Sequence, residues 1–231
     1  NADDPAVRSL GAGLKSEVLL FSRLEKIKNG AWHDGLYHFC RESGGRCMTV
    51  DGRAALLKGT HNIENMLAAG LVGFLCGLSA DEIRGGLTTF RGLAHRMEFV
   101  DEIGEVRFFD DSKGTNVGAV IKSLESLPGP IVLIAGGVDK GGSYAPLETL
   151  LREKGKALVL LGEARGRIAA ELGHILPVVQ ADSMEAAVAE GFRIAAPGDS
   201  VLLSPACASF DMFTSYAHRG QCFVDAVKNL K

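Results

Sequence analysis

From about Leu93 onward, short apolar segments alternate with segments of helical periodicity. The apolar segments predict strands at residues 105–109, 131–135, 157–161, 177–180 and 201–203. The segments between them predict helices at residues 117–127, 146–152, 165–172, 183–195 and 220–230. Short, mostly apolar strands are typical of a parallel sheet buried on both faces, and repeated β-α-β crossovers give a doubly wound sheet. We therefore predict a Rossmann-like, mostly parallel α/β domain.

The first ninety or so residues predict a few strands and two helices. Residues 18–21 predict a short strand, and alternating apolar side chains over residues 30–39 predict a hairpin. Residues 62–75 carry apolar side chains on one broad helical face, and Ser79 with Glu82 forms a capping-box pattern that opens a second helix. Helices with one apolar face pack on a sheet, and the few short strands predicted here would form only a small sheet.

The length of 231 residues suits two domains of the usual size of roughly 100 to 200 residues. We place the boundary near residue 93. Because the sheet before it is thin, we expect residues 1–93 to be the trailing part of a larger α/β domain whose first half lies upstream. Residues 94–231 form the Rossmann-like domain in this interpretation.

Charge and hydropathy favour small-molecule ligands. The formal net charge is −3, and the lysines and arginines are scattered along the chain, which favours neither nucleic acid nor a membrane surface as a partner. No apolar run approaches the ~18 residues that span a bilayer, and the first residues lack the pattern of a signal peptide. We expect a cytoplasmic protein that binds neither nucleic acid nor membrane.

The cysteine pattern predicts reduced thiols. The five cysteines are an odd number and contain no C-x-x-C pair, as expected in a reducing compartment. Cys207 lies within a polar segment described below, and no histidine accompanies it in a recognisable pattern. We expect it to be a buried, unreactive thiol.

Polar side chains gather between one predicted strand and the helix that follows it. Residues 109–116 read F-D-D-S-K-G-T-N. In an open α/β sheet this corner lies at the carboxyl end of a strand, beside the amide groups of a helix N-terminus, where anionic ligands collect. An ordinary acidic turn with an Asx or Ser cap accounts for the same residues, so this motif alone leaves both interpretations open.

Two further corners of the same sheet end in polar groups. Residues 136–142 are a glycine-rich turn that presents Lys140, a point charge suited to a carboxylate or phosphate. Residues 203–213 contain small residues that allow close approach, with Ser209 near a helix start. Each of these is also compatible with a plain turn, and the chain has neither a P-loop nor a G-x-G-x-x-G after a strand. Three such corners along one edge predict a shared anion pocket.

Two other polar segments lie outside those corners. H-N-I-E-N at residues 61–65 opens a helix, where Asn65 suits either a heterocyclic ligand or a capping role. H-R-M-E at residues 95–98 lies at the predicted domain junction. Arg96 can reach a phosphate there or form an ion pair with a carboxylate.

Together these segments resemble the Mur ligase family, and within it the members that add D-glutamate. The resemblance covers essentially the whole chain and rests on H-N-I-E-N, H-R-M-E, D-D-S-K-G-T-N at residues 110–116, G-G-V-D-K at residues 136–140 and L-S-P-A-C-A-S-F-D-M-F at residues 203–213, followed by R-G at residues 219–220. It implies an ATP-dependent ligase of peptidoglycan precursor synthesis, and hence of cell wall biogenesis, cell shape and cell division. Such an enzyme adds D-glutamate to UDP-N-acetylmuramoyl-L-alanine through an acyl phosphate.

The resemblance also implies roles for individual residues. Lys113 is the expected catalytic residue, facing phosphate or the incoming carboxylate. The residues expected to contact ATP are Asn65, Arg96 and, at the ribose, Asp111. The residues expected to hold D-glutamate are Thr115, Lys140, Ser209, Phe210 and Tyr216. Gly114 stands where many relatives have alanine, and we expect this difference to have little effect beyond backbone freedom.

The family's uridine domain, P-loop and magnesium ligands are expected upstream of this chain, so residues 1–93 are read as the end of the central ATPase domain. We expect the chain by itself to be an inactive, monomeric fragment with no metal ligands of its own. Two alternatives remain: a ligase resembling folylpolyglutamate synthase, against which residues 110–113 and 204–209 count, and a non-catalytic Rossmann-like module that binds nucleotide or amino acid. A P-loop in the gene-length sequence would favour the enzyme.

Overall fold

The computed structural model describes residues 1–57 and 59–230. The chain divides into two compact units, the first ending at Arg91 and the second beginning at Gly92. Each unit has a hydrophobic core of its own. The identity of the first unit as part of an ATPase domain stays a prediction.

The first unit is a four-stranded sheet on which two helices pack. The strands lie in chain order as β1 (Leu20–Ser22), β2 (Gly30–His33), β3 (Tyr37–Arg41) and β4 (Arg46–Val50), with β1 parallel to β2 and the other pairs antiparallel. The two packed helices are α2 (Thr60–Leu75) and α3 (Ala80–Thr89). A third helix, α1 (Pro5–Leu10), precedes β1 and is followed by the 3-10 turn η1 (Gly11–Gly13). The predicted hairpin is β2 and β3, and the capping box of α3 is present in full. β4 and α1 are additional to the predicted elements.

Cys40 and Cys47 form a disulfide, so the expectation of five reduced thiols is wrong. The two residues stand opposite each other in the register of β3 and β4, with Cα atoms 4.2 Å apart. Hairpin register, which the sequence spacing does not reveal, brings them together. Cys76, Cys207 and Cys222 are free, and Cys207 is buried as predicted.

The second unit contains the predicted doubly wound sheet. Its strand order is β5-β6-β10-β7-β8-β9. The strands are β5 (Glu98–Ile103), β6 (Val106–Asp110), β7 (Ile131–Gly136), β8 (Gly155–Leu161), β9 (Val178–Gln180) and β10 (Ser200–Leu203). All neighbours pair in parallel except β5, which pairs antiparallel with β6 at the edge. The sequence did not predict β5, because its half-exposed, charged pattern lacks the apolar run of a central strand.

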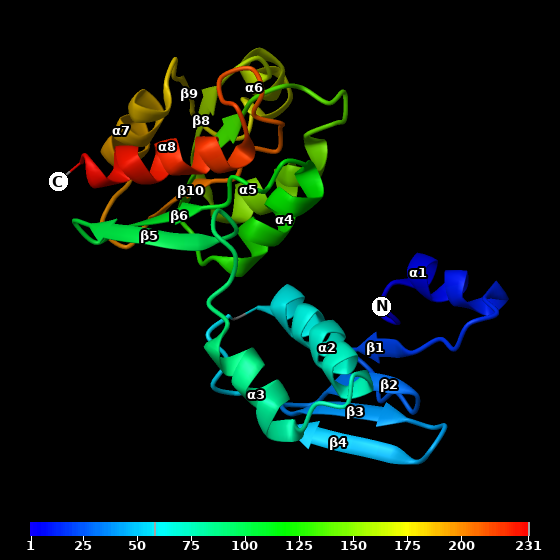
Figure 1. The fold of residues 1–231 in the computed structure, drawn as a ribbon. Helices are drawn as coiled ribbons and strands as arrows, with labels where there is room; N and C mark the ends of the chain where they lie inside the picture. Colours follow the sequence, from blue (N-terminus) through cyan, green and yellow to red (C-terminus); the bar gives the residue numbers. More distant parts are fainter. Residues whose placement is uncertain (58, 231) are drawn as a thin grey trace. The chain divides into compact units, whose positions relative to one another are not determined.

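Helices cover both faces of this sheet (Figure 1). One face packs against α4 (Val117–Ser126), α5 (Glu148–Lys154) and α6 (Arg165–Leu172), and the other packs against α7 (Met184–Ile194) and α8 (Tyr216–Lys228). Alternate residues of the central strands therefore enter opposite cores, as Leu133 and Ile134 do. Within the described residues, no helix combines the length and apolar character needed to cross a bilayer.

Two helix starts differ from the sequence-based expectation. α5 begins after the 3-10 turn η2 (Ala145–Leu147), which contains the proline at which the helix was predicted to start. α8 begins at Tyr216 rather than residue 220, because the Ser215 hydroxyl caps it by accepting a hydrogen bond from the His218 N–H. Tyr216 therefore lies in the first turn of a helix, and Arg219 lies one turn further in.

Candidate functional site

The three polar corners predicted from the sequence are neighbours in the structure. β10 lies between β6 and β7 and is parallel to both, with Leu203 in register with Asp110 and with Ile134. The carboxyl ends of these strands therefore meet at one edge of the sheet. Backbone hydrogen bonds join the corners directly, from the Ala206 N–H to the Gly114 carbonyl and from the Val138 N–H to the Ala208 carbonyl.

A buried arginine that sequence reasoning had not assigned a role connects all three corners. Arg219 of α8 is only 1% exposed. Its guanidinium donates to the Ser112 hydroxyl at 3.0 Å and carbonyl at 2.9 Å in the first corner. It also donates to the carbonyls of Gly136 at 3.5 Å, Cys207 at 3.1 Å and Ala208 at 3.3 Å. Burial lowers the pKa of Arg219 to about 10, so the side chain stays protonated at neutral pH.

Two lysines predicted to bind substrate lie on the exposed side of these corners. The Lys113 ammonium lies 4.0 Å from the centre of the Tyr216 ring, a cation–π contact. The Lys140 ammonium donates to the Thr115 carbonyl at 2.7 Å, so the glycine-rich corner reaches the corner after β6. The structure thus brings Lys113 next to Tyr216 and Lys140 next to Thr115. Both lysines are exposed to solvent.

The other two residues predicted to hold D-glutamate follow β10. Ser209 is buried, and its carbonyl accepts hydrogen bonds from the Met212 and Phe213 N–H groups in a turn. Phe210 is 75% exposed. An aromatic ring this exposed at the edge of a corner is available to cover a ligand.

Asp111 points into the protein instead of toward solvent. Its carboxylate accepts hydrogen bonds from the Ser123 hydroxyl at 2.6 Å and the Ser204 hydroxyl at 2.7 Å. Desolvation by burial raises the pKa of Asp111. In this arrangement the Asp111 side chain links the corner after β6 to α4 through Ser123 and to the corner after β10 through Ser204. The contact of Asp111 with a nucleotide ribose stays a prediction.

Gly114 has a steric role that the sequence analysis did not anticipate. A Cβ atom at this position would lie 2.3 Å from the Asp111 carboxylate and 2.6 Å from the Ser204 hydroxyl. Real Cβ atoms essentially never come this close to another heavy atom. Gly114 therefore makes room for the hydrogen bond between Asp111 and Ser204, and the expectation that alanine here changes little is not supported.

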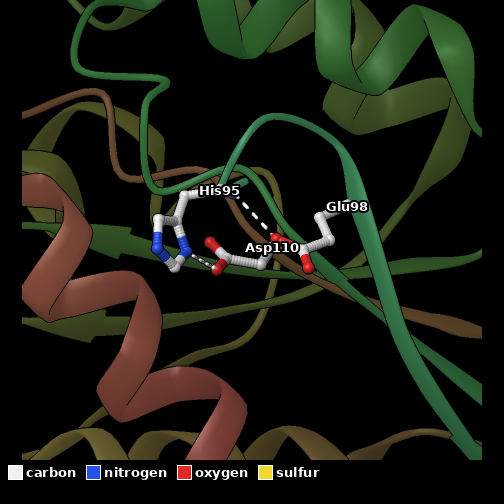
Figure 2. A group of neighbouring side chains, drawn as sticks. All are labelled: His95, Glu98 and Asp110. Atoms are coloured by element: carbon white, nitrogen blue, oxygen red, sulfur yellow. Dashed lines mark hydrogen bonds and ion pairs between the residues drawn. The ribbon is translucent and has the colours of Figure 1, made fainter. Parts of the chain in front are cut away.

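His95, just before β5, forms a second polar cluster with Glu98 and the buried Asp110 (Figure 2). The His95 imidazole contacts the Asp110 carboxylate at 2.7 Å, and the Glu98 carboxylate accepts from the His95 N–H at 2.8 Å. The His95 carbonyl in turn accepts from the Lys113 N–H at 3.0 Å. His95 is left-handed at φ 62°, so the turn that joins this cluster to Lys113 is tightly constrained. Gly220 of α8 leaves the space that the imidazole fills.

The potential metal ligands of this cluster are already engaged. His95, Glu98 and Asp110 are the one group found within residues 1–57 and 59–230 that could hold a metal ion. Asp110 accepts from His95 and from the Ser112 N–H at 2.8 Å, and Glu98 accepts from the His95 N–H. Mg²⁺ prefers a shell of oxygen ligands and water. One imidazole with two hydrogen-bonded carboxylates does not fit that preference.

The residues predicted to contact ATP lie apart in the chain. Asn65 is an exposed residue of α2 in the first unit, and Arg96 is an exposed residue just before β5 in the second unit. Exposed amide and guanidinium groups of this kind are free to meet a nucleotide.

Comparison with known proteins gives consistent matches. Residues 95–207 match the family model described as Mur ligase, glutamate ligase domain. The UDP-N-acetylmuramoylalanine--D-glutamate ligase of Geotalea daltonii is 49% identical over 232 residues, covering 100% of this chain and 51% of that protein. A relative of the same name from Syntrophus aciditrophicus is 42% identical and covers 99% of this chain and 50% of that protein. The chain thus spans about half the length of the curated relatives it matches.

Solved structures of low sequence identity share the fold. MurF ligase of Thermotoga maritima, in complex with ADP, aligns with a TM-score of 0.62 at 18% identity, over 100% of this chain and 53% of that one. A murein peptide ligase of Psychrobacter arcticus aligns with a TM-score of 0.63 at 14% identity, over 97% of this chain and 49% of that one. The match over residues 95–207, together with 42–49% identity along essentially the whole chain, shows that the chain belongs to the Mur ligase family.

Proposed function

We propose that the protein to which this chain belongs adds D-glutamate to UDP-N-acetylmuramoyl-L-alanine at the expense of ATP, in peptidoglycan precursor synthesis. The observation that carries the proposal is the edge of the sheet where the three corners meet. Lys113 and Lys140 are exposed there, and the buried Arg219 forms hydrogen bonds to all three corners. A dicarboxylate needs cationic groups and backbone amides near its two ends. The printed name of relatives that match essentially the whole chain supports the choice of D-glutamate.

In this proposal, five residues hold the amino acid. Lys140 contacts one carboxylate and gives up its contact with the Thr115 carbonyl, while the Thr115 and Ser209 hydroxyls offer hydrogen bonds. The rings of Phe210 and Tyr216 cover the aliphatic part of D-glutamate. All five come from the three corners or from the first turn of α8.

Lys113 is proposed as the catalytic residue. ATP supplies the phosphoryl group that activates the substrate carboxylate as an acyl phosphate. The D-glutamate nitrogen then attacks the acyl carbon, a carbon–nitrogen bond forms, the bond to phosphate oxygen breaks, and the nitrogen loses a proton. Negative charge grows on the oxygens of the reacting centre during the attack. The Lys113 ammonium stabilises that charge if it turns from the Tyr216 ring toward it.

Asn65 and Arg96 are proposed to bind ATP, Asn65 through its amide and Arg96 through a phosphate. The magnesium ion that accompanies ATP is proposed to take its ligands from residues outside this chain, because the His95 cluster does not fit it. We further propose that the protein works as a cytoplasmic monomer on small-molecule substrates. The nucleotide substrate is bound elsewhere in the gene-length protein.

The test is phosphate release by the gene-length protein with ATP, Mg²⁺ and UDP-N-acetylmuramoyl-L-alanine. Release that requires D-glutamate, with L-glutamate inactive at the same concentration, supports the proposal. Equal rates with the two enantiomers contradict the substrate assignment. Release with folates in place of the nucleotide substrate would favour a folylpolyglutamate-type ligase, and binding of glutamate or nucleotide without any turnover would favour a binding module.

A further inference from the structure

The loop after β7 carries Lys140 and is rich in glycine. Gly136, Gly137 and Gly141 have φ angles of 126°, 133° and 77°, all in the region that side chains disfavour. Glycine loses more conformational entropy than other residues when it is ordered. The position of Lys140 therefore depends on contacts that hold this loop from outside.

Arg167 of α6 provides two of those contacts, one on each side of Lys140. Its guanidinium donates to the Asp139 carboxylate at 2.5 Å and to the Gly142 carbonyl. Asp139 precedes Lys140 directly, and Gly142 follows two residues later. A planar guanidinium with several donors in fixed geometry suits such a double attachment, whereas a lysine has a single ammonium.

The two carboxylates that Arg167 contacts extend the attachment through the loop. Asp139 also accepts from the Gly141 N–H at 2.9 Å and from the Tyr144 hydroxyl at 3.3 Å. Glu171, one turn further along α6, accepts from the Arg167 Nε at 3.2 Å and from the Tyr144 N–H at 2.7 Å. Hydrogen bonds thus reach both sides of Lys140.

The same network contacts the corner after β10. The Tyr144 hydroxyl lies 3.1 Å from the Cys207 sulfur, and the Cys207 carbonyl accepts a hydrogen bond from Arg219. Lys140 reaches the corner after β6 through the Thr115 carbonyl. Arg167 therefore holds, through Asp139, a loop whose Lys140 contacts the corner after β6 and whose Tyr144 contacts the corner after β10.

We propose that Arg167 is a positioning residue that holds Lys140 in the amino-acid pocket and so sets the affinity for the carboxylate of the incoming amino acid. The inference rests on the proposed function, because it takes Lys140 as the group that meets that carboxylate. It adds a residue on a different element, α6, that does not touch the substrate.

Exposure indicates where the effect of Arg167 should be seen. The side chains of Arg167, Asp139 and Glu171 are 35%, 22% and 27% exposed. Partly exposed ion pairs contribute little to global stability, so loss of Arg167 should leave the fold intact. Without Arg167 the loop samples other conformations, and ordering it again when the amino acid binds lowers the affinity for the amino acid.

The experiment measures steady-state kinetics of the gene-length protein carrying Arg167→Met, Arg167→Lys or Arg165→Met. Arg165 is the matched control, because it lies on the same helix and pairs with Asp182 at 2.6 Å away from the Lys140 loop. For Arg167→Met we expect the KM for D-glutamate to rise about three- to tenfold, the range for loss of a partly exposed charge-assisted contact. The kcat, the KM for ATP and the melting temperature should change little, Arg167→Lys should recover part of the effect, and Arg165→Met should behave as the wild type.

Amide hydrogen exchange over residues 136–144 provides a second readout, with faster exchange expected in Arg167→Met only. An unchanged KM for D-glutamate in Arg167→Met overturns the inference, whether or not the loop exchanges faster. Equal rises in the KM values for D-glutamate and ATP also overturn it, because they indicate general damage to the site. If the wild type itself does not use D-glutamate, the proposed function fails and the role of Arg167 fails with it.

Discussion

The guanidinium of Arg219 and residue Ser112, 107 positions apart in the chain, form two hydrogen bonds, to the Ser112 hydroxyl at 3.0 Å and to its carbonyl at 2.9 Å. Through these bonds α8 holds the corner that follows β6. The remaining guanidinium hydrogen bonds hold the corners that follow β7 and β10. One buried cation therefore determines the spacing of all three parts of the candidate pocket.

Replacement of Arg219 by methionine should destabilise the second unit severely. The change leaves the carbonyls of Ser112 and Cys207 without the guanidinium donor in a buried region, and loss of such a network costs about 3–5 kcal/mol of unfolding free energy. Denaturant unfolding followed by circular dichroism measures this loss. Arg193→Met is the matched control, because Arg193 pairs with Glu190 on the surface of α7 with its side chain 66% exposed, and it should cost less than about 0.5 kcal/mol.

Gly114→Ala should destabilise the protein by about 1–3 kcal/mol, as overpacking of a filled site does. The added methyl group would lie 2.3 Å from the Asp111 carboxylate and 2.6 Å from the Ser204 hydroxyl. Thermal unfolding compares this variant with Gly166→Ala, a change in α6 where no atom lies within 4 Å of the new methyl group. Gly166→Ala should be neutral or stabilising by about 0.5–1 kcal/mol, because alanine favours a helix over glycine. Equal stability of the two variants would show that the first corner has room for a side chain.

Asp111 should make stability depend on pH in a direction opposite to that of most carboxylates. Burial raises the pKa of Asp111 above its usual value of 3.8, so the folded state holds the proton more tightly than the unfolded state. Its contribution to stability is therefore greatest below pH 3.8 and is lost as the pH rises through the raised pKa. The difference in melting temperature between wild type and Asp111→Asn isolates this contribution. As the pH rises from 4 to 7, the melting temperature of the wild type should fall relative to that of Asp111→Asn. A rise of the wild-type melting temperature relative to that of the variant would contradict the assigned direction.

The central strands and the three corners could be predicted from the sequence, because both leave local signals. β7 and β10 are apolar runs, and polar residues such as Lys113 and Lys140 follow strands directly. Edge strands leave weaker signals: β5 and β4 are half exposed and carry charged residues, so neither was predicted.

The contacts that hold the site together could not be predicted, because they join residues distant in sequence. Arg219 bonds Ser112 across 107 positions, and the hydroxyls that engage Asp111 come from Ser123 and Ser204. The Cys40–Cys47 disulfide depends on hairpin register rather than spacing. The buried direction of the Asp111 side chain is likewise not visible in its sequence context, and its contact with a nucleotide ribose stays a prediction.

The most direct test of the proposed pocket compares Lys140→Ala with Lys122→Ala in the gene-length protein. Lys122 is a surface lysine of α4 that pairs with Glu125 outside the three corners. We predict that Lys140→Ala raises the KM for D-glutamate by about tenfold or more, as expected for a lost contact between an ammonium and a carboxylate, while Lys122→Ala has no effect. An unchanged KM for D-glutamate in Lys140→Ala would contradict the claim that the three corners form the amino-acid pocket.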